Sequence, residues 1–309
     1  MAVLASASRD RERFVATDDF DITRDARGHT AFDHGIHFCR PGDGTAAGAL
    51  AAGVGAPAAG SGNPWWGPVS ICESDAMMRT IGLLGGMSWE STAEYYRLLN
   101  ELTRERLGGL HSSRCVLYSV DFAEIERLQV EGRWDEAADV LVQAAKALES
   151  AGADTLLICT NTMHKVADQV AAAVGIPLLH LADTTAEAVR AKGLHRVGLL
   201  GTAFTMEQDF YRGRLASHGL DVLVPDAAGR DTVHRVIYDE LCRGIVREES
   251  RAAFMAVIGD LVAAGAEGVV LGCTEIELLI GPEHSPVPVF PTTRLHAEAA
   301  VRHALGHSE

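Results

Sequence analysis

Two stretches of this chain repeat each other, and each places a cysteine at the end of an apolar run. The first reads Ala151-Gly-Ala-Asp-Thr-Leu-Leu-Ile-Cys159, and the second reads Ala264-Gly-Ala-Glu-Gly-Val-Val-Leu-Gly-Cys273. A Gly-Leu-Leu-Gly motif likewise occurs twice, within residues 80–85 and 196–201, at an offset of 116 residues, against 113 to 114 for the cysteine segments. Ordered internal matches indicate duplication of one structural unit. We therefore expect two similar lobes related by a pseudo-two-fold axis, with one thiol on each side of the cleft between them.

Short apolar runs alternate with amphipathic stretches through most of the chain. The predicted strands are residues 80–84, 115–120, 155–158, 176–181, 196–200, 221–224, 269–271 and 287–290, with helices between them that include 89–107, 134–150 and 163–174. This alternation is typical of parallel sheets with helices on both faces. The expected fold is α/β, with ligand bound beyond the carboxyl ends of the strands, where Cys159 and Cys273 fall.

The composition changes near residue 77. Residues 41–70 are dominated by Gly, Ala and Pro, and offer too little large apolar surface to offset the entropy of ordering them. We expect residues 1–76 to be a disordered or non-functional extension. The first lobe is then predicted to comprise residues 77–183 and 292–309, and the second residues 184–291.

A segment inside that extension has a different origin. Residues 13–39 resemble the haem-binding loop of bacterial haem-thiolate monooxygenases, through the spacing of Phe32, Gly35 and Cys39. The resemblance ends at Cys39, because Pro41 stands where the family has glycine and the Gly/Ala-rich tract replaces the following helix. We interpret it as a truncated, non-functional remnant. A haem or redox-thiol binding protein remains the alternative from another functional class.

The net charge and the spacing of the cysteines limit the kinds of partner that this protein is expected to bind. The formal net charge is −15, which argues against nucleic acid and anionic membranes as partners. The amino terminus is a poor signal peptide. The six cysteines are scattered without a C-x-x-C pair, which favours reduced thiols in a cytoplasmic protein over a disulfide or metal framework. We expect no metal.

The prediction of proton-transfer chemistry rests on the two duplicated cysteines. A single cysteine after an apolar strand is usually a small buried hydrophobe. Cys159 and Cys273, however, are each followed by threonine and another polar residue where a helix is expected to begin. A helix amino terminus lowers the pKa of a thiol and favours the thiolate. Two such thiols facing one cleft suit the transfer of a proton between the two faces of a carbon.

Residues 78–309 resemble the aspartate/glutamate racemase family throughout. The motifs that carry the resemblance are Gly82-Leu-Leu-Gly-Gly-Met-Ser-Trp-Glu, Leu110-His-Ser-Ser, Tyr118-Ser-Val-Asp-Phe, Cys159-Thr-Asn-Thr-Met-His, Gly201-Thr-Ala-Phe-Thr and Gly272-Cys-Thr-Glu. The resemblance implies a cofactor-independent amino-acid racemase that acts as a homodimer. Some relatives replace one cysteine by threonine, whereas this chain is expected to keep both.

The mechanism implied by the resemblance is a two-base racemisation. One cysteine removes the Cα proton as a thiolate while the other delivers a proton to the opposite face. Because the Cα–H is a very weak acid, the developing charge needs placed donors. The predicted substrate-binding residues are Met87 and Ser88 in the turn after the first strand, with Asn161, Thr162, Thr202, Thr205, Thr274 and Glu275. Thr184 and Thr292 are expected to be ordinary helix N-caps.

The substrate stays open between aspartate, glutamate and a broad range of amino acids. Many aspartate racemases have a Pro-Asp-Arg segment whose arginine pairs with the side-chain carboxylate, but residues 119–126 contain no arginine. Maleate isomerases, hydantoin racemases and arylmalonate decarboxylases share the architecture and stay as alternatives.

Overall fold

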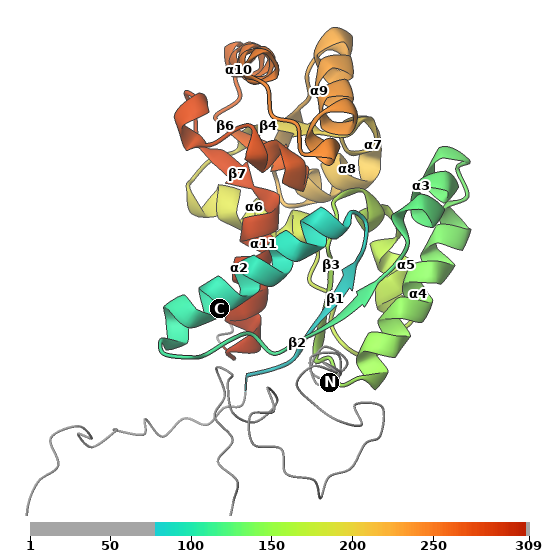
Figure 1. Cartoon of the computed structure of the whole chain (residues 1–309). Coiled ribbons are helices and arrows are strands. Elements are labelled where there is room, and N and C mark those ends of the chain that lie inside the picture. The colour runs from blue at the N-terminus through green and yellow to red at the C-terminus, as the bar shows by residue number, and fades with distance from the viewer. Residues whose placement is uncertain (1–77, 307–309) are drawn as a thin grey trace, which may run out of the picture. The chain divides into compact units, whose positions relative to one another are not determined.

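The chain forms two parallel sheets, one in each of two lobes. The computed structural model describes residues 78–306, which all belong to one compact unit, Cys72–Glu309. The strand orders are β2-β1-β3 and β5-β4-β6-β7, and helices cover both faces of each sheet (Figure 1). The predicted α/β fold with two lobes is confirmed. The expectations for residues 1–76, including the haem-loop resemblance, lie outside the described residues.

The first sheet is built around β1, whose five residues are all buried. It comprises β1 (Ile81–Gly85), β2 (Cys115–Ser119) and β3 (Thr155–Ile158), with helices α2 (Trp89–Leu107), α3 (Phe122–Val130), α4 (Trp134–Ser150) and α5 (Ala167–Ala172). Alternate residues of β1 face opposite sides: Leu83 packs into the core formed with α2, and Leu84 into the core formed with α4. Two-sided burial explains why this strand is an unbroken apolar run.

The second sheet follows the same plan with one more strand. Its strands are β4 (Arg196–Gly201), β5 (Asp221–Leu223), β6 (Gly268–Gly272) and β7 (Val289–Pro291). One face is covered by α6 (Leu181–Ala191) and α8 (Asp209–Ser217), and the other by α9 (Ala227–Asp239) and α10 (Glu248–Ala263). The short helices α7 (Ala203–Glu207), η2 (Leu241–Arg243), η3 (Thr274–Leu278) and η4 (Pro282–His284) occupy the connections.

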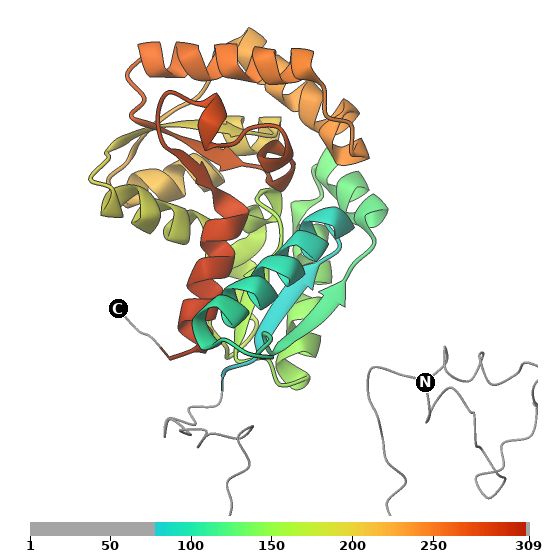
Figure 2. The ribbon, with the colours of Figure 1, turned by 60° about the vertical axis from the view of Figure 1, so that its left-hand side comes forward.

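The carboxyl-terminal helix α11 (Thr292–Ala304) connects the two lobes. It leaves the end of β7 and runs beside α2, as both views show (Figures 1 and 2). Its apolar residues, such as Ala297 and Val301, enter the core that β1 and α2 form in the first lobe, while Leu181 at the start of α6 enters the core of the second. The chain therefore crosses between the lobes at two places, before α6 and at α11. Within residues 78–306, no helix is both long and apolar enough to cross a membrane.

Two predicted elements are wrong in detail. Residues 176–181 do not form a strand; they contribute only a single parallel bridge between Leu178 and Leu156 before α6 begins at Leu181. Pro177 lacks a donor and offers only its carbonyl, which accepts from the backbone N–H of Leu156 at 2.9 Å. The helix predicted at residues 163–174 is split into a 3-10 turn, η1 (Thr162–Val166), and the short α5.

Two glycines with positive φ differ in how closely neighbouring atoms pack against them. Gly86, between β1 and α2, has a φ of 93°, and Gly152, after α4, has a φ of 89°. Both conformations disfavour a β-carbon. A β-carbon on Gly86 would also collide with the backbone of Val120, whereas one on Gly152 would meet nothing within 4 Å.

We expect Gly152→Ala to lower the free energy of unfolding by about 1 kcal/mol, from backbone strain alone. Gly86→Ala should lower it by about 2–4 kcal/mol, because overpacking is added to the strain. Urea denaturation followed by circular dichroism measures both. Equal losses for the two variants would contradict the tight packing of the turn.

Candidate active site

The ends of four strands, two from each lobe, converge on one cavity. The turn after β1 supplies Met87 and Ser88, and the residues after β3 supply Thr160 to Thr162. From the second lobe, Thr202 follows β4, and Cys273 to Glu275 follow β6. All of these strands run parallel within their sheets, so their carboxyl ends come to the same edge.

Most of the predicted site residues are brought together here. Those that line the cavity are Met87, Ser88, Asn161, Thr162, Thr202, Cys273, Thr274 and Glu275. Thr205 lies behind them: it is fully buried, and its hydroxyl is 3.3 Å from that of Thr202. Thr205 therefore positions Thr202 and does not line the cavity itself.

Cys159 requires a correction. Its side chain is fully buried in the first lobe's core among Leu83, Tyr95 and Leu157, and it does not line the cavity. Burial, and then the neighbouring Cys115, raise the pKa of the Cys159 thiol, opposite to the predicted lowering. The physical reason is the alternation of side chains along an extended segment, which turns Cys159 toward the core. Thr160, the next residue, is half-buried and lines the cavity in its place.

The repeat itself contained the signal for Thr160. Aligned without a gap at the offset of 113 residues, Ala151 falls on Ala264, Cys159 on Gly272 and Thr160 on Cys273. Pairing Cys159 with Cys273 needs a one-residue shift within the apolar run. Because one residue reverses the direction of a side chain, that shift exchanged a core residue for a cavity residue.

Cys273 is hydrogen-bonded to the carboxylate that lines the cavity. Its thiol donates a hydrogen bond to Glu275 Oε2 at 2.9 Å, and Ser88 Oγ, from the other lobe, donates to Glu275 Oε1 at 3.1 Å. Burial, and then the Glu275 carboxylate, raise the pKa of the Cys273 thiol well above its ordinary value. Cys273 is thus a neutral thiol at rest, already paired with a group that can accept its proton. The predicted depression of its pKa by a helix is wrong, since η3 is a five-residue 3-10 turn.

A chain of hydroxyl groups joins the two lobes beside Cys273. Thr293 donates to Thr274 Oγ1 at 3.2 Å, and Thr274 lies 2.8 Å from Ser91 Oγ. Ser91 in turn donates to the carbonyl of Cys159 at 3.0 Å, so Thr274 is the donor to Ser91. Each hydroxyl has one proton, and these contacts give the chain a single direction. The chain fixes the backbone on both sides of the cavity.

Asn161 presents an unused acceptor. Its side-chain nitrogen donates to Thr292 Oγ1 at 3.2 Å, which in turn donates to the carbonyl of Leu271 at 2.9 Å. The amide oxygen, Asn161 Oδ1, is buried and has no hydrogen-bond partner among residues 78–306. Thr292 thus anchors Asn161. The N-cap roles predicted for Thr292 and Thr184 are wrong, because Pro291 is the N-cap of α11 and His180 that of α6. A buried acceptor without a partner is costly, and a bound donor would relieve that cost.

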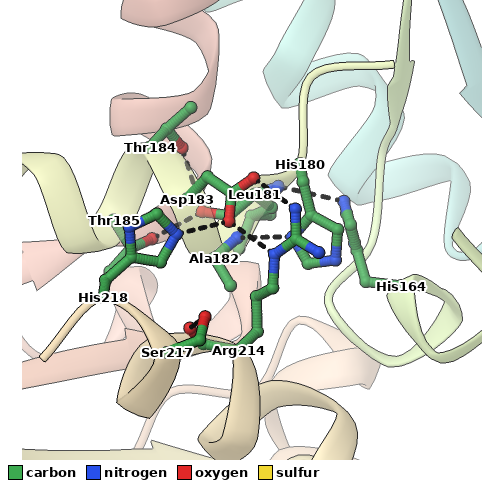
Figure 3. Close-up of polar contacts among 10 residues, drawn as sticks. All are labelled: His164, His180, Leu181, Ala182, Asp183, Thr184, Thr185, Arg214, Ser217 and His218. Atoms are coloured by element: carbon green, nitrogen blue, oxygen red, sulfur yellow. Dashed lines mark hydrogen bonds and ion pairs between the residues drawn. The ribbon is translucent and has the colours of Figure 1, made fainter. Parts of the chain in front are cut away.

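His164 ties the Thr160 loop to the second lobe (Figure 3). The backbone N–H of Leu181, at the start of α6, donates to His164 Nε2 at 3.2 Å. Nδ1 therefore carries the proton and donates to the carbonyl of Thr160 at 2.8 Å. Burial, and then the neighbouring His180 and His296, hold the pKa of His164 well below its ordinary value, so the ring stays neutral. His164 positions Thr160 through its backbone.

The start of α6 is held in turn by an ion-pair cluster in the second lobe. Asp183 accepts two hydrogen bonds from Arg214, both at 2.7 Å, and one from His218 at 2.8 Å (Figure 3). Burial opposes the ionisation of Asp183, but the bonds from Arg214 and His218 outweigh it and hold the pKa of Asp183 at about 2. Paired hydrogen bonds between a guanidinium and a carboxylate are among the strongest side-chain contacts.

Several residues of the cavity were not predicted from the sequence. Besides Thr160, they are Ser91, Phe122, Gln129, Ile237, Tyr238 and Cys242. Most lie on α3, α9 and η2, which come to the cavity from the sides, and only Phe122 among these belongs to a motif that carries the family resemblance. Only the tertiary arrangement of the helices brings them to the strand ends.

The fold agrees with the comparisons to known proteins. The sequence model of the Asp/Glu/Hydantoin racemase family matches residues 84–300. An assigned Asp/Glu racemase of known structure from Yersinia pestis is 54% identical, with a TM-score of 0.71, and the match covers 74% of this chain and 100% of that one. The aspartate racemase homologue PH1733 from Pyrococcus horikoshii OT3 is 34% identical, with a TM-score of 0.67, over 74% of this chain and 99% of that one.

The broad specificity amino-acid racemase RacX from Bacillus subtilis (strain 168) is 20% identical over 72% of this chain and 96% of its own length. The chain belongs to the Asp/Glu/Hydantoin racemase family, and is an enzyme of the isomerase class. A separate short likeness, 64% identity over 36 residues, is to Cytochrome P450 107B1 from Saccharopolyspora erythraea. It spans 9% of that protein, too little to carry a haem site over to this chain.

The Asp183 cluster should make stability depend on pH in the acid range. Because the pKa of Asp183 is lowered from 3.8 to about 2, its contribution is complete above about pH 4 and is lost as pH falls toward 2. We expect Asp183→Asn to lower the free energy of unfolding by about 2 kcal/mol at pH 7, with the difference shrinking between pH 4 and 2. Urea titrations at a series of pH values measure it.

Asp209→Asn is the matched control. Asp209 pairs with Arg212 on the same helix but its side chain is 91% exposed, so we expect a change below about 0.5 kcal/mol at every pH. A pH-independent loss in Asp183→Asn would show that the cluster acts by shape and not by charge.

Proposed function

We propose that this protein is a cofactor-independent amino-acid racemase in which Cys273 is the principal base and Thr160 faces it from the other lobe. The observation that carries the proposal is the hydrogen bond from the half-buried Cys273 to Glu275, at the edge of a cavity that Thr160 lines from the first lobe. A thiol paired with a carboxylate can become a thiolate when substrate arrives. The proposal replaces the two-cysteine pair predicted from the sequence with a cysteine–threonine pair.

The first step is proton removal from Cα. Glu275 takes the proton of Cys273, and the resulting thiolate removes the Cα–H of the amino acid. Asn161 Oδ1 is available to accept from the substrate ammonium group, which relieves its unsatisfied state. The hydroxyls of Thr162 and Thr202, which line the cavity, are candidate donors to the substrate carboxylate as negative charge develops, whereas the Thr274 proton is already donated to Ser91.

The second step differs between the two faces. A proton returned by Cys273 regenerates the starting enantiomer, and a proton from the Thr160 hydroxyl gives the other. The Thr160 alkoxide left behind takes its proton back from water, and the hydroxide formed takes the proton that Glu275 received from Cys273, so the site returns to its starting state. The Thr160 hydroxyl is a far weaker acid than a thiol, so it donates to the carbanion slowly, and by microscopic reversibility the reverse reaction that starts at Thr160 is equally slow. We therefore expect the enantiomer whose Cα–H faces Cys273 to exchange this proton with solvent many times for each inversion.

Thr160→Cys tests this asymmetry. It supplies a second thiol at the opposing face, and we expect racemisation to rise roughly 10²-fold while exchange of the favoured enantiomer changes little. Exchange of the Cα–H in deuterated water, followed by NMR, and chiral chromatography measure the two rates separately. L and D amino acids have equal free energies, so racemisation must show the same kcat/KM in both directions, which checks the assay.

Two cysteine variants serve as controls. Cys273→Ser should abolish both exchange and racemisation, since it removes the base with little change in volume. Cys159→Ala should leave both rates unchanged, because its thiol lies in the core. The variant should lose only a modest amount of folding stability. If Cys159→Ala abolished racemisation in a folded protein while Thr160→Ala did not, the cysteine–threonine pair would be wrong.

The carboxylate of Glu275 should control the titration of Cys273. Burial and Glu275 both raise the thiol pKa, so the thiolate is scarce at neutral pH and exchange should speed up as pH rises. Glu275→Gln removes the charge, and we expect the alkylation of Cys273 by iodoacetamide to shift to lower pH. Exchange activity should fall in the same variant, because the proton acceptor is lost. Peptide mass spectrometry separates Cys273 from Cys242, and an unshifted profile would contradict the pairing.

We also propose that the enzyme acts as a homodimer, as the resemblance implies. Exposed apolar side chains on the first lobe support a protein contact there: Trp89 and Tyr96 on α2, and Leu117 and Tyr118 on the edge strand β2. An exposed apolar edge strand invites pairing with another chain. Light scattering should give twice the chain mass, and an active preparation of single-chain mass would contradict the proposal.

A further inference from the structure

The side chains of the cavity contain no positive charge. Its fifteen lining residues, all in the described part of the chain, include hydroxyls, amides, thiols, aromatic rings and one carboxylate, but no lysine, arginine or histidine. The carboxylate is Glu275, which is 8% exposed and already accepts from Ser88 and Cys273. A ligand entering this cavity therefore meets one fixed negative charge and otherwise neutral groups.

Three basic side chains of neighbouring elements are engaged elsewhere, and Arg235 on α9 and Arg243 on η2 do not line the cavity. Lys165, on η1, binds Gln208 Oε1 at 2.7 Å, and its ammonium group lies 3.8 Å from the centre of the Trp134 ring. Arg214 is held by Asp183, and Arg212 lies 2.9 Å from Asp209. None of them lines the cavity.

The charges of the cavity lining limit the class of amino acid that can bind there. The ammonium group of an α-amino acid can be matched by Glu275 and Asn161 Oδ1, and its carboxylate by hydroxyl and backbone donors. A second carboxylate, as in aspartate, would be desolvated beside Glu275 without a cation to pair with. A second ammonium, as in lysine, would need a second buried carboxylate, and the cavity lining has none. Only an uncharged side chain leaves every buried charge matched.

The wall between α3 and α9 fits such a side chain. Phe122 and Gln129 come from α3, and Ile237 and Tyr238 from α9, so the wall is apolar with a few neutral polar groups. Burial, and then the thiols and carboxylates nearby, raise the pKa of Tyr238 to about 12, which leaves its hydroxyl a neutral donor. The amide of Gln129 points at Met163 Sδ at 3.1 Å and is also neutral.

We propose that the substrate is an α-amino acid with an uncharged side chain, which packs against the wall formed by Phe122, Gln129, Ile237 and Tyr238. The proposal rests on the proposed racemase function and restricts its substrate to one chemical class. It departs from a dicarboxylic substrate, for which the cavity offers no counter-charge.

The wild-type protein decides the question with a panel of single-enantiomer amino acids. Methionine, glutamine, serine and homoserine represent uncharged side chains, aspartate and glutamate acidic ones, and lysine and arginine basic ones. We expect Cα–H exchange in deuterated water to be at least 10-fold faster for the best uncharged member than for any charged one. A charged amino acid as the fastest substrate would overturn the proposal. No exchange with any member, in a folded protein, would overturn the racemase function and this proposal with it.

Phe122→Arg tests where the side chain binds. It places a cation on the wall, and the ratio of aspartate to methionine exchange should rise at least 10-fold. Phe210→Arg is the matched control, since Phe210 lies on α8 outside the cavity, and its ratio should stay at the wild-type value. Thermal unfolding establishes that each variant is folded. An unchanged ratio in folded Phe122→Arg would overturn the placement against this wall, and the wild-type panel decides the substrate class even if that variant does not fold.

Discussion

The buried carboxylate of Glu275 is the interaction on which the site depends. An ionised carboxylate shielded from water is costly unless donors surround it. Its donors come from both lobes, Ser88 after β1 and Cys273 after β6. The same contact that stabilises the carboxylate thus joins the lobes and places a thiol beside a proton acceptor. Opening the lobes would expose Glu275 to water and separate it from Ser88, so the closed arrangement and the chemistry depend on one group.

The remaining polar contacts reinforce this closed arrangement from the sides. Thr293 at the start of α11 begins the hydroxyl chain that ends at the carbonyl of Cys159. His164 holds the carbonyl of Thr160 and receives the first N–H of α6. Both contacts act on the backbone around residue 160 from elements that cross between the lobes. The position of Thr160 relative to Cys273 is therefore determined by hydrogen bonds to the backbone beside these residues, made from elements that connect the lobes.

The sequence was sufficient for seven of the eight predicted strands, and insufficient where one residue decides the direction of a side chain. Continuous apolar runs such as residues 81–84 predict strands buried on both faces, because a parallel sheet covered by helices hides both sides. The run at 176–181 failed as a strand because Pro177 cannot donate and α6 begins early. The prediction for Cys159 failed because the residue types alone do not distinguish a core position from the cavity position next to it. Phe122 and Tyr238 were missed because their helices meet the cavity only through tertiary packing.

The two lobes show how far a duplicated fold constrains chemistry. Each lobe places a short polar segment beyond a buried parallel strand. One segment begins at Thr160, beyond β3, and the other begins at Cys273, directly after β6. The strands must keep their apolar pattern to remain in the sheets, whereas the residues beyond them face the cavity and contribute little to either core. The repeated unit therefore preserves the position of the two opposing groups while allowing them to differ. A threonine opposite a cysteine is compatible with the symmetric backbone, and the asymmetry of proton transfer that we propose follows from the difference between a hydroxyl and a thiol at equivalent places.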